Sequence, residues 1–600
     1  MSVRSAPLAR RPVSRATMGA LGGGVVLVVL AIVAPQFLNG YWTTNLILAA
    51  TYAIATLGLT VVLGYTGQIS LAQGAFYGIG AYTVALLTTK ANLDFWIALV
   101  AAILVSGALG LALGLVTLRI SGHYLAMVTI SFQVIVTVVL SNWTALTGGP
   151  DGVTGILRPL AGPIDMMIDR NFLYLTLAIL LVVALAVMAL KRSRWGRAMQ
   201  GVRENELAAE VIGVPTFHIK VAAFAICSAL GGLGGGLYAV GSMYISPDTF
   251  DFSQSVLFLT MVLLGGAQWV VGSIFGSIGL TILPQLLRSI PGSVYLAIYG
   301  LVVILVMVFL PEGIWGLFAR LARRITGPAA PTTVTEAEPL VVAPPLAAAT
   351  GPLLCTEGLT KRFGGVRAVD AVDVAVQPGE VHALIGPNGS GKSTLLNLLN
   401  SIYTPTGGRI LFRGRPIQRL APHRIAAAGM ARTFQNIRLF KDLTVLENVM
   451  IGADTLRYRR GVGSKRRDAR QQALAALDFV DMAHRSDELA KNLPYGHQRL
   501  VEIARALAGE PSLLLLDEPG AGMNPAEKGA LVTLIKRLHE RGLTILLVEH
   551  DMSLVTEVSK RMSVLNFGRK IADGVPREIM TNKDVVDAYL GTELTEVAAS

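Results

Sequence analysis

The chain has 600 residues, of which 52% are hydrophobic and 15% are charged, with a formal net charge of +12. Because a soluble globular protein carries about 25% charged residues, this composition excludes a wholly soluble enzyme, an intrinsically disordered chain and a coiled coil. The two cysteines, Cys227 and Cys355, lie far apart and form neither a metal-ligand spacing nor a disulfide framework.

The charge is distributed unevenly on the two sides of residue 325. Residues 1–325 carry 18 basic and 10 acidic residues, whereas the remaining 275 residues carry 33 and 29. The first part has a membrane composition and the second part a soluble one. Because most of the basic excess lies beside apolar stretches, it favours a topology signal over nucleic-acid binding, and no nucleic-acid partner is expected.

Apolar stretches of about 18 or more residues with few charges predict transmembrane helices. Basic residues precede the first stretch and follow the last, which places both ends of this region in the cytoplasm and requires an even number of spans. If the long apolar stretch 254–289 crosses the membrane twice, the chain has about ten spans. Alternatively, 68–88 or 254–289 is re-entrant. The first stretch is interpreted as a retained helix, because no signal-peptide cleavage site follows it. Besides 254–289, the predicted spans are 19–38, which is the first stretch, 45–64, 68–88, 95–118, 123–142, 171–190, 219–243 and 293–311.

Glycines are dense at 64–80 and at 231–236. Small residues let membrane helices approach closely, and glycine interruptions can also free backbone groups to line a cavity. Two interpretations therefore stay open. One is tight helix packing, and the other is a substrate path near Gly67–Gly80 lined by Gln68, Ser70 and Gln73.

A connector of about 25 residues follows the apolar region. Residues 326–350 contain five prolines together with Ala and Thr, and they show no apolar periodicity, which predicts an extended, exposed segment. We therefore expect a transmembrane domain at 1–325, a linker at 326–350 and a soluble domain at 351–600.

The soluble part begins with a phosphate-loop pattern in its strand–loop–helix context. The apolar segment 381–385 leads into a GxxxxGK[ST] sequence and then a helical-looking LLNLLN. Glycines in such a loop let backbone N–H groups and a helix N-terminus face phosphates, the lysine adds charge, and the first hydroxyl after the lysine can ligate Mg²⁺. The predicted nucleotide-binding residues here are Gly386, Pro387, Asn388, Gly389, Ser390, Gly391, Lys392, Ser393 and Thr394.

Two further apolar runs end in polar residues, as buried parallel strands do at a catalytic edge. The first ends in Asp517 and Glu518, of which Asp517 is suited to hold Mg²⁺ through water and Glu518 to polarise the attacking water. The second, 544–548, ends in Glu549 and His550, and His550 is placed to contact a γ-phosphate.

The order of these motifs, with Gln435 in ARTFQNIRLF and the segment LPYGHQR at 493–499, resembles the nucleotide-binding domain of ABC transporters over about 352–592. The resemblance implies that Phe363 stacks on adenine and that Gln435 couples the γ-phosphate and Mg²⁺ to the membrane part. It also implies that 493–498 is the signature motif, presented to ATP on a second domain. Tyr495, Gly496 and Gln498 would be its nucleotide-facing residues.

The signature departs from the common LSGGQ sequence. Pro494 stands at the serine position and offers neither a hydroxyl nor an N–H, and Tyr495 replaces the first glycine. Asn524 stands where many members have Asp. These variants resemble the ATPase subunits of branched-chain amino-acid importers, as does IADGVPREI near the C-terminus. How well this signature serves the opposite ATP site stays open.

The membrane part independently resembles the permease subunit of the same importers, at 64–87, 197–214 and 309–316. Residues 207–213 resemble the EAA loop of ABC importers, with Leu207 where that pattern has Glu. The resemblance implies a short cytosolic helix that docks into a groove of the ATPase domain. The alternative is an ordinary amphipathic interfacial helix.

The resemblance therefore implies a polytopic all-α transmembrane domain fused to an α/β P-loop ABC ATPase. Such a chain imports branched-chain amino acids or similar solutes across the bacterial inner membrane, with ATP and Mg²⁺ as cofactors. Expected partners are membrane lipid, an extracytoplasmic binding protein, and either a second permease and ATPase or a second copy of the chain. Alternatives are an exporter or flippase, an ATP-gated channel or sensor, and an importer of urea, amides or aromatic acids.

Overall fold

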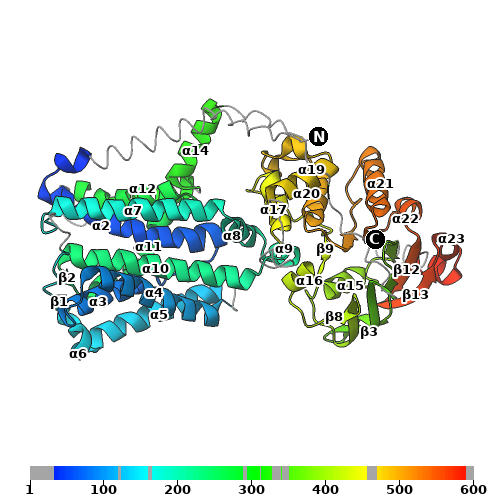
Figure 1. Cartoon of the computed structure of the whole chain (residues 1–600), viewed down its shortest axis with the longest axis horizontal. Helices are drawn as coiled ribbons and strands as arrows, with labels where there is room; N and C mark the ends of the chain where they lie inside the picture. The colour runs from blue at the N-terminus through cyan, green and yellow to red at the C-terminus, as the bar shows by residue number, and fades with distance from the viewer. Residues whose placement is uncertain are drawn as a thin grey trace, which may run out of the picture. The chain divides into compact units, whose positions relative to one another are not determined.

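The computed structural model describes residues 33–118, 123–159, 165–287, 294–310, 312–326, 340, 351–455 and 469–589. The chain divides into two compact units (Figure 1). One comprises residues 1–199 and 217–329, and the other 200–216 and 330–600. The predicted boundaries at 325 and 350 stay predictions, because the connector lies outside the described residues except for residues 326 and 340.

The first unit, called the membrane unit below, is helical over its described residues apart from one two-stranded antiparallel ribbon. Its elements are η1 (Ala34–Gln36), α2 (Gly40–Leu59), the π-helix η2 (Thr60–Tyr65), α3 (Gln73–Thr89), α4 (Phe95–Thr117), α5 (His123–Asn142), α6 (Thr144–Thr147), η3 (Gly149–Asp151), β1 (Val153–Thr154), α7 (Asp169–Arg192), the first part of α8 (Arg194–Glu204, of which residues 200–204 belong to the second unit), α10 (Thr216–Ser242), β2 (Tyr244–Ile245), η4 (Pro247–Phe250), α11 (Phe252–Gly265), α12 (Val270–Leu287), α13 (Val294–Phe309) and α14 (Gly313–Thr326).

Within the described ranges, six helices are long and apolar enough to cross a membrane, namely Gly40–Tyr65, Phe95–Thr117, Tyr124–Asn142, Asp169–Arg192, Thr216–Ser242 and Val270–Leu287. The predicted first span, 19–38, falls largely outside those ranges. The stretch 254–289 forms two helices, α11 and α12, so it is not one simple span. Since α3 and α13 have 17 and 16 residues, the total of about ten spans stays a prediction.

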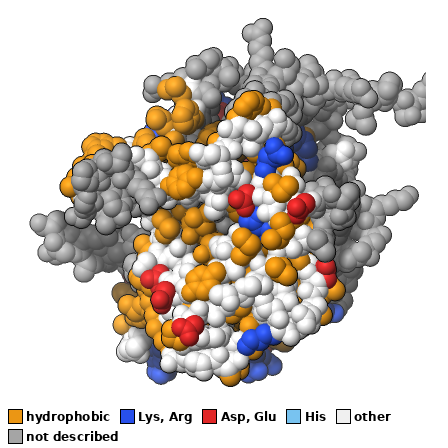
Figure 2. All heavy atoms as spheres, turned by 90° about the vertical axis from the view of Figure 1, so that its left-hand side faces the viewer, with side chains coloured by type: hydrophobic (Ala, Val, Ile, Leu, Met, Phe, Trp, Pro, Cys, Tyr) orange, Lys and Arg blue, Asp and Glu red, His pale blue; other side chains and the backbone are white. Residues whose placement is uncertain are grey.

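The ends and sides of this unit differ in side-chain character. Figure 2 shows the end where β1 and β2 lie, on which hydrophobic side chains are interspersed with separate acidic and basic ones. Along α4, by contrast, Ile97, Val100 and Leu104 are exposed and apolar. A charged end and an apolar side along α4 are the pattern expected of helices that cross a hydrocarbon layer.

The dense glycines pack helices against one another. A Cβ atom at Gly80 would lie 2.1 Å from the carbonyl oxygen of Gly232, and one at Gly235 would lie 1.8 Å from that of Tyr77. Helices α3 and α10 therefore touch backbone to backbone, which confirms the packing interpretation at these positions.

Gln73 is fully buried, and its side-chain amide donates hydrogen bonds to the carbonyls of Ala55 on α2 and Cys227 on α10, at 2.7 and 3.3 Å. Gln73 thus joins three helices, and the alternative of a substrate path lined by Gln68, Ser70 and Gln73 stays a prediction. Ser70 is also buried, whereas Gln68 is partly exposed.

The second unit, called the ATPase unit below, combines two sheets with helices. Its elements are α9 (Glu206–Ile212), β3 (Leu354–Phe363), β4 (Val366–Val372), β5 (Ala375–Val376), β6 (Val381–Ile385), α15 (Lys392–Leu399), β7 (Gly407–Phe412), β8 (Arg415–Pro416), α16 (Pro422–Ala428), β9 (Met430–Arg432), α17 (Val445–Asp454), α19 (Ala469–Phe479), η5 (Ala483–Arg485), η6 (Ala490–Asn492), α20 (Tyr495–Leu507), β10 (Leu513–Asp517), α21 (Pro525–Glu540), β11 (Thr544–Val548), α22 (Met552–Val558), β12 (Arg561–Asn566), β13 (Arg569–Gly574) and α23 (Pro576–Ile579).

The larger sheet has the order β13-β12-β6-β11-β10-β9 and is parallel except for the β12–β13 pair. Every residue of β6, β10 and β11 is buried, as the continuous apolar runs predict for strands covered on both faces. Because the carboxyl ends of neighbouring parallel strands lie at one edge, the segments that follow these strands meet there. The three predicted strands are confirmed.

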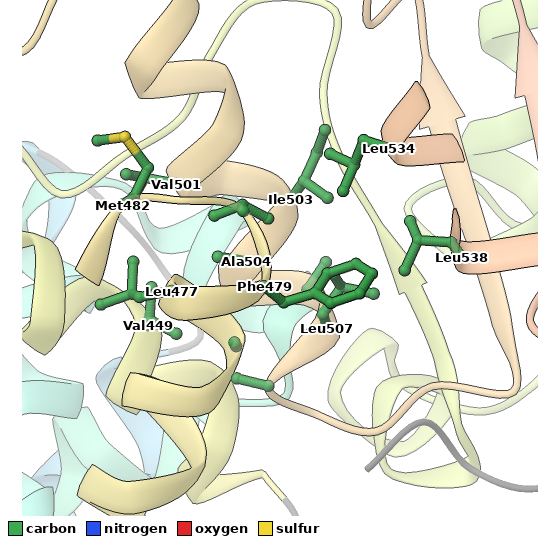
Figure 3. Packing of buried hydrophobic residues seen from close by; sticks show 14 of the residues in the cluster. Val449, Leu477, Phe479, Met482, Val501, Ile503, Ala504, Leu507, Leu534 and Leu538 are labelled. Atoms are coloured by element: carbon green, nitrogen blue, oxygen red, sulfur yellow. The ribbon is translucent and has the colours of Figure 1, made fainter. Parts of the chain in front are cut away.

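The smaller sheet is antiparallel, with the order β4-β3-β7-β8 and β5 paired to β3. A separate helical layer is built from α17, α19, α20 and α21. Figure 3 shows its core around Phe479, with Val449, Leu477 and Leu507 among the neighbouring side chains. This layer carries α20, the helix that begins in the predicted signature motif.

Candidate functional site

The phosphate-loop pattern forms the turn between β6 and α15. Gly391, which precedes α15, has φ of +100°, and a Cβ atom there would lie 2.4 Å from the carbonyl oxygen of Ala368. Only glycine fits this position without strain. Pro387 and Ser390 are buried, Asn388 and Gly389 are exposed, and Ser393 is exposed in the first turn of α15.

Lys392 is 7% exposed and lies under this loop. Its ammonium donates hydrogen bonds to the carbonyls of Gly386 and Pro387, at 2.7 and 2.9 Å. Burial lowers the pKa of Lys392, and the nearby carboxylates of Glu518 and Asp517 oppose that shift. The loop therefore wraps a cation that faces two carboxylates.

Asp517 ends β10 and is held from one side. Its Oδ2 accepts a hydrogen bond from Arg432 at 2.8 Å, and both side chains are almost fully buried. Arg432 also donates to Asn397 of α15 at 2.8 Å. The other oxygen, Oδ1, is buried without a hydrogen-bond partner among the described residues. One carboxylate oxygen is thus fixed by the protein and the other is left for a ligand.

Three predicted catalytic residues come together around Glu518, which directly follows Asp517. Glu518 accepts a hydrogen bond from the Gln435 side-chain amide at 2.9 Å, and His550 Nδ1 lies 3.8 Å from the same oxygen. Glu518 adopts φ of +46°, a strained conformation for a non-glycine residue, and its N–H donates to the carbonyl of Val548 at 2.8 Å. The strain turns the carboxylate at the end of β10 toward residues after β9 and β11.

Glu549, to which the sequence assigned no role, supports this arrangement. It is 1% exposed, accepts hydrogen bonds from the N–H groups of Gly520 and His550, and has its pKa raised by burial. It therefore ties the loop after Glu518 to the segment that carries His550.

The predicted base-stacking residue lies at the end of β3. Phe363 is 43% exposed. Its ring meets that of Tyr403 edge-on at a centroid distance of 5.1 Å, and Lys361 Nζ lies 5.0 Å above it. An exposed aromatic ring with a second ring beside it suits stacking on a planar base, and Tyr403 and Lys361 are additions that the sequence did not single out.

The predicted signature residues lie at the start of α20. Pro494 is the N-cap and supplies no side-chain hydrogen bond. Tyr495 is 44% exposed, Gly496 is buried, and the Gln498 amide donates to the carbonyl of Leu493 at 2.8 Å. In the part of the chain that the structure describes, no hydrogen bond or ion pair joins Tyr495, Gly496 or Gln498 to the phosphate loop.

A buried ionic cluster links α20 to the segment that carries Gln435. Arg499, Glu502 and Arg505 are each no more than 1% exposed, and Arg499 pairs with Glu502 at 2.9 Å. Arg499 also donates to the carbonyls of Phe434 and Gln435, at 2.5 and 2.7 Å. The position of Gln435 is therefore fixed from the signature helix.

Arg438 carries this linkage to α9. Its N–H donates to Glu502 at 3.2 Å, its carbonyl accepts from Arg505 at 2.7 Å, and its guanidinium donates to Asn205 Oδ1 at 3.3 Å. Asn205 is also the N-cap of α9, where the same oxygen accepts from the N–H of Ala208. One residue thus joins the signature helix to α9.

Other contacts hold α9 within the ATPase unit. The N–H of Asp442 donates to Glu204 at 2.9 Å, and the Thr455 hydroxyl donates to the carbonyl of Ile212 at 2.7 Å. The helix ends at Gly213 in the left-handed conformation. The short helix predicted at 207–213 is therefore confirmed, together with its packing on the ATPase fold.

Signals for the residues that the sequence analysis missed are weak. Arg432, Arg499 and Arg505 are charged residues within apolar segments, which indicates burial with a partner, but the partner is defined only by the fold. Asp517, Glu518 and His550, by contrast, stand at or just after the ends of recognisable strands.

Three family models match the chain. "Branched-chain amino acid transport system / permease component" covers residues 41–310, "ABC transporter" covers 369–521, and "Branched-chain amino acid ATP-binding cassette transporter" covers 569–595. Among solved structures, an ATP-binding cassette of an ABC transporter in its ADP conformation is 33% identical, with a TM-score of 0.36, and the alignment covers 40% of this chain and 100% of that one.

Curated relatives resemble the ATPase unit. The high-affinity branched-chain amino acid transport ATP-binding protein BraF of Pseudomonas aeruginosa is 43% identical over 254 residues, which are 40% of this chain and 98% of the relative. LivG of Escherichia coli strain K12, described in the same words, is 42% identical over 251 residues, which are 40% of this chain and 98% of LivG. The ATPase domain therefore hydrolyses ATP in a process coupled to transport. The chain belongs to the branched-chain amino acid ABC transporters and joins the permease component and the ATPase of that family in one polypeptide.

Proposed function

We propose that this chain is an importer subunit that moves branched-chain amino acids, or similar small solutes, inward across a bacterial inner membrane. The observation that carries the proposal is the docking of α9 in the ATPase unit. This helix belongs in sequence to the permease part, between α8 and α10, and Arg438 joins it to the helix of the signature motif. ATP-dependent movement at the signature thereby reaches the permease.

The proposed ATP chemistry divides among the residues gathered at the sheet edge. Backbone N–H groups of the loop 386–391 and Lys392 bind the phosphates, and Phe363 stacks on the base. Glu518 acts as general base on the attacking water, while Gln435 and His550 hold the γ-phosphate end of the site. Positioning and electrostatics are the main sources of rate in phosphoryl transfer.

The residues at this edge also fit Mg²⁺. The unpartnered Oδ1 of Asp517, the exposed hydroxyl of Ser393 and the side-chain oxygen of Gln435 are hard oxygen ligands. No cluster of three or more metal-ligating His, Cys, Asp or Glu side chains occurs in the described ranges, which agrees with an ion bound by one carboxylate together with substrate phosphates. The ion supplies charge neutralisation at the β- and γ-phosphates.

The signature residues suit a site completed by another ATPase domain. Tyr495 is exposed and shares no hydrogen bond with the phosphate loop of its own chain. We therefore propose that Tyr495, Gly496 and Gln498 face ATP on a second copy of this chain or on a separate ATPase subunit. A second permease and an extracytoplasmic binding protein complete the proposed complex, with the ATPase unit in the cytoplasm.

The test replaces Glu518 by Gln in cells that naturally make the protein, so that every partner is present. Uptake of radiolabelled leucine, isoleucine and valine is measured at low micromolar concentration, with urea and benzoate as comparison solutes. We expect the variant to lose uptake of the branched-chain amino acids while uptake of the comparison solutes is unchanged.

Two other results reassign the function. Loss of urea or benzoate uptake alone identifies another solute class. A higher intracellular level of the labelled amino acids in the variant identifies an exporter, since export of the label would then have stopped.

A further inference from the structure

A lysine lies over the ring that is predicted to stack on the base. Lys361 precedes Phe363 by two residues on β3, and its Nζ is 5.0 Å from the centroid of the Phe363 ring and 5.9 Å from that of the Tyr403 ring. A ring attracts a cation placed in this way. One ammonium group therefore contacts both members of the edge-on aromatic pair, and the rest of the exposed Phe363 ring is left for a planar base.

The same ammonium joins β3 to the segment between α15 and β7. Lys361 Nζ donates a hydrogen bond to the carbonyl of Thr404 at 2.7 Å, and Thr404 directly follows Tyr403. A second hydrogen bond joins the same two segments, from the N–H of Arg362 to the hydroxyl of Thr406 at 3.1 Å. The lysine thus contacts the two rings and also connects the two segments that carry them.

Tyr403 is fixed in turn to the helix that begins in the phosphate loop. Helix α15 starts at Lys392, and the N–H of Tyr403 donates to the carbonyl of Asn397 in this helix at 3.2 Å. The side-chain oxygen of Asn397 accepts a hydrogen bond from Arg432, which also donates to Asp517. The position of the aromatic pair is therefore set relative to the phosphate end of the proposed site.

The stability of the fold does not account for the contacts of this lysine. Phe363 and Tyr403 are 43% and 37% exposed, and the hydrogen bond from Lys361 also lies at an exposed position. Charged groups at exposed positions contribute little to folding. A binding surface that is already ordered, however, binds its ligand more tightly, because less ordering remains to be done on binding.

We propose that Lys361 is a positioning residue for the base of the nucleotide, whose ammonium holds the Phe363 ring and the segment of Tyr403 in the arrangement that the base requires. The inference rests on the proposed nucleotide site and adds to it a residue that acts through Phe363. Because this role concerns the base, loss of the ammonium leaves the binding of the phosphates unchanged.

The experiment compares Lys361→Met, which removes the ammonium and keeps an unbranched side chain, with Lys536→Met at the exposed pair with Glu557. Both are made in the full chain in lipid nanodiscs, with Glu518→Gln to prevent turnover. Isothermal titration calorimetry with Mg²⁺ present measures the dissociation constants of ATP and of ribose triphosphate, which lacks the base. We expect Lys361→Met to weaken binding of ATP about 2- to 5-fold and to leave binding of ribose triphosphate unchanged. Lys536→Met should change neither.

Two results overturn the proposal. One is an unchanged dissociation constant of ATP in Lys361→Met. The other is equal weakening for ATP and for ribose triphosphate, which assigns the effect to the charge of the lysine acting on the phosphates or to a disturbed fold.

Phe363→Leu separates this proposal from the base site itself. If Phe363→Leu binds ATP as tightly as the unchanged chain, the proposed base site is wrong and the role of Lys361 falls with it. If Phe363→Leu weakens binding of ATP and Lys361→Met does not, only the role of Lys361 is wrong.

Discussion

The two units differ in the polar groups that join their elements. Where α2 and η2 meet α12 in the membrane unit, the buried partners are neutral hydroxyls, although the buried Arg158 elsewhere in this unit pairs with the partly exposed Asp169. Thr56 pairs with Ser277 at 2.8 Å, and Thr60 pairs with Ser273 at 2.6 Å. In the ATPase unit they are ions, among which Arg499 and Glu502 pair at 2.9 Å with neither side chain exposed.

The difference follows from what each unit has to position. Neutral hydroxyl pairs and glycines let helices approach closely at little desolvation cost. Buried ions are costly unless several hydrogen bonds satisfy them, but a guanidinium reaches carbonyls on distant segments. The membrane unit is therefore held by the fit of helix surfaces, and the site of the ATPase unit by directed ionic contacts.

The largest expected effect tests backbone contact in the membrane unit. Gly235→Val places side-chain atoms where the Tyr77 carbonyl lies, so α3 and α10 have to separate. We expect no monodisperse protein on size-exclusion chromatography after purification in detergent. Gly279→Ala is the control, because no atom lies within 4 Å of its Cβ position. A well-folded Gly235→Val chain would mean that the close approach is dispensable.

The next effect tests the ionic cluster of the ATPase unit. Arg499→Met leaves Glu502 buried without its main partner, and we expect a loss of about 3–5 kcal/mol in the free energy of unfolding of this unit. Denaturant unfolding of the full chain measures it. The exposed pair Lys536–Glu557 is the matched control, because Lys536→Ala is expected to cost at most about 1 kcal/mol. If the two variants lose the same free energy of unfolding, burial does not make the Arg499–Glu502 pair more important than the exposed Lys536–Glu557 pair.

A smaller effect is expected from the neutral pairs. Ser273→Ala removes the partner of Thr60, and hydrogen bonds between membrane helices contribute about 0.6 kcal/mol on average. The unfolding of the membrane unit in mixed micelles measures the difference. A loss as large as that of Arg499→Met is the result that would remove the contrast between the units.

The smallest expected effect is a pH dependence at Glu204. Burial raises the pKa of this side chain, Asp442 adds to the shift, and Arg203 and two backbone N–H groups oppose it. An acid whose pKa is higher in the folded state destabilises that state above its folded pKa, and the penalty disappears as the pH falls below the unfolded value. Packing of α9 should therefore become slightly more stable as the pH falls from neutral toward the ordinary glutamate value of 4.5.

Glu204→Gln is the control for this prediction, because it keeps an acceptor for the Asp442 N–H and cannot titrate. Hydrogen exchange of residues 206–212 measures the effect. The same pH dependence in the variant and in the unchanged chain would assign it to another group.

The sequence pattern was more specific for the proposed ATP site than for the number of membrane spans. Asp517 and Glu518 were recognisable because they end or directly follow a buried strand, and Lys392 because it stands in the loop pattern between β6 and α15; both are local patterns. The ionic cluster was not, since Arg499 finds its acceptors about 65 residues earlier in the chain. In the membrane unit, α13 with 16 residues and α11 with 14 fall below the length of a simple span, so hydropathy alone does not settle their number.

Arg438 is proposed to pass movement of the signature helix to α9, and the variant Arg438→Met tests this role. Leucine uptake is measured in cells that naturally make the protein, and ATP hydrolysis is measured on the complex purified from the same cells. Glu518→Gln, in which both rates should fall together, is the reference. For Arg438→Met we predict that hydrolysis stays within about two-fold of the unchanged complex while uptake falls at least ten-fold, because a directed hydrogen bond to Asn205 is lost. Unchanged uptake, or uptake and hydrolysis that fall in proportion, would contradict this role of Arg438.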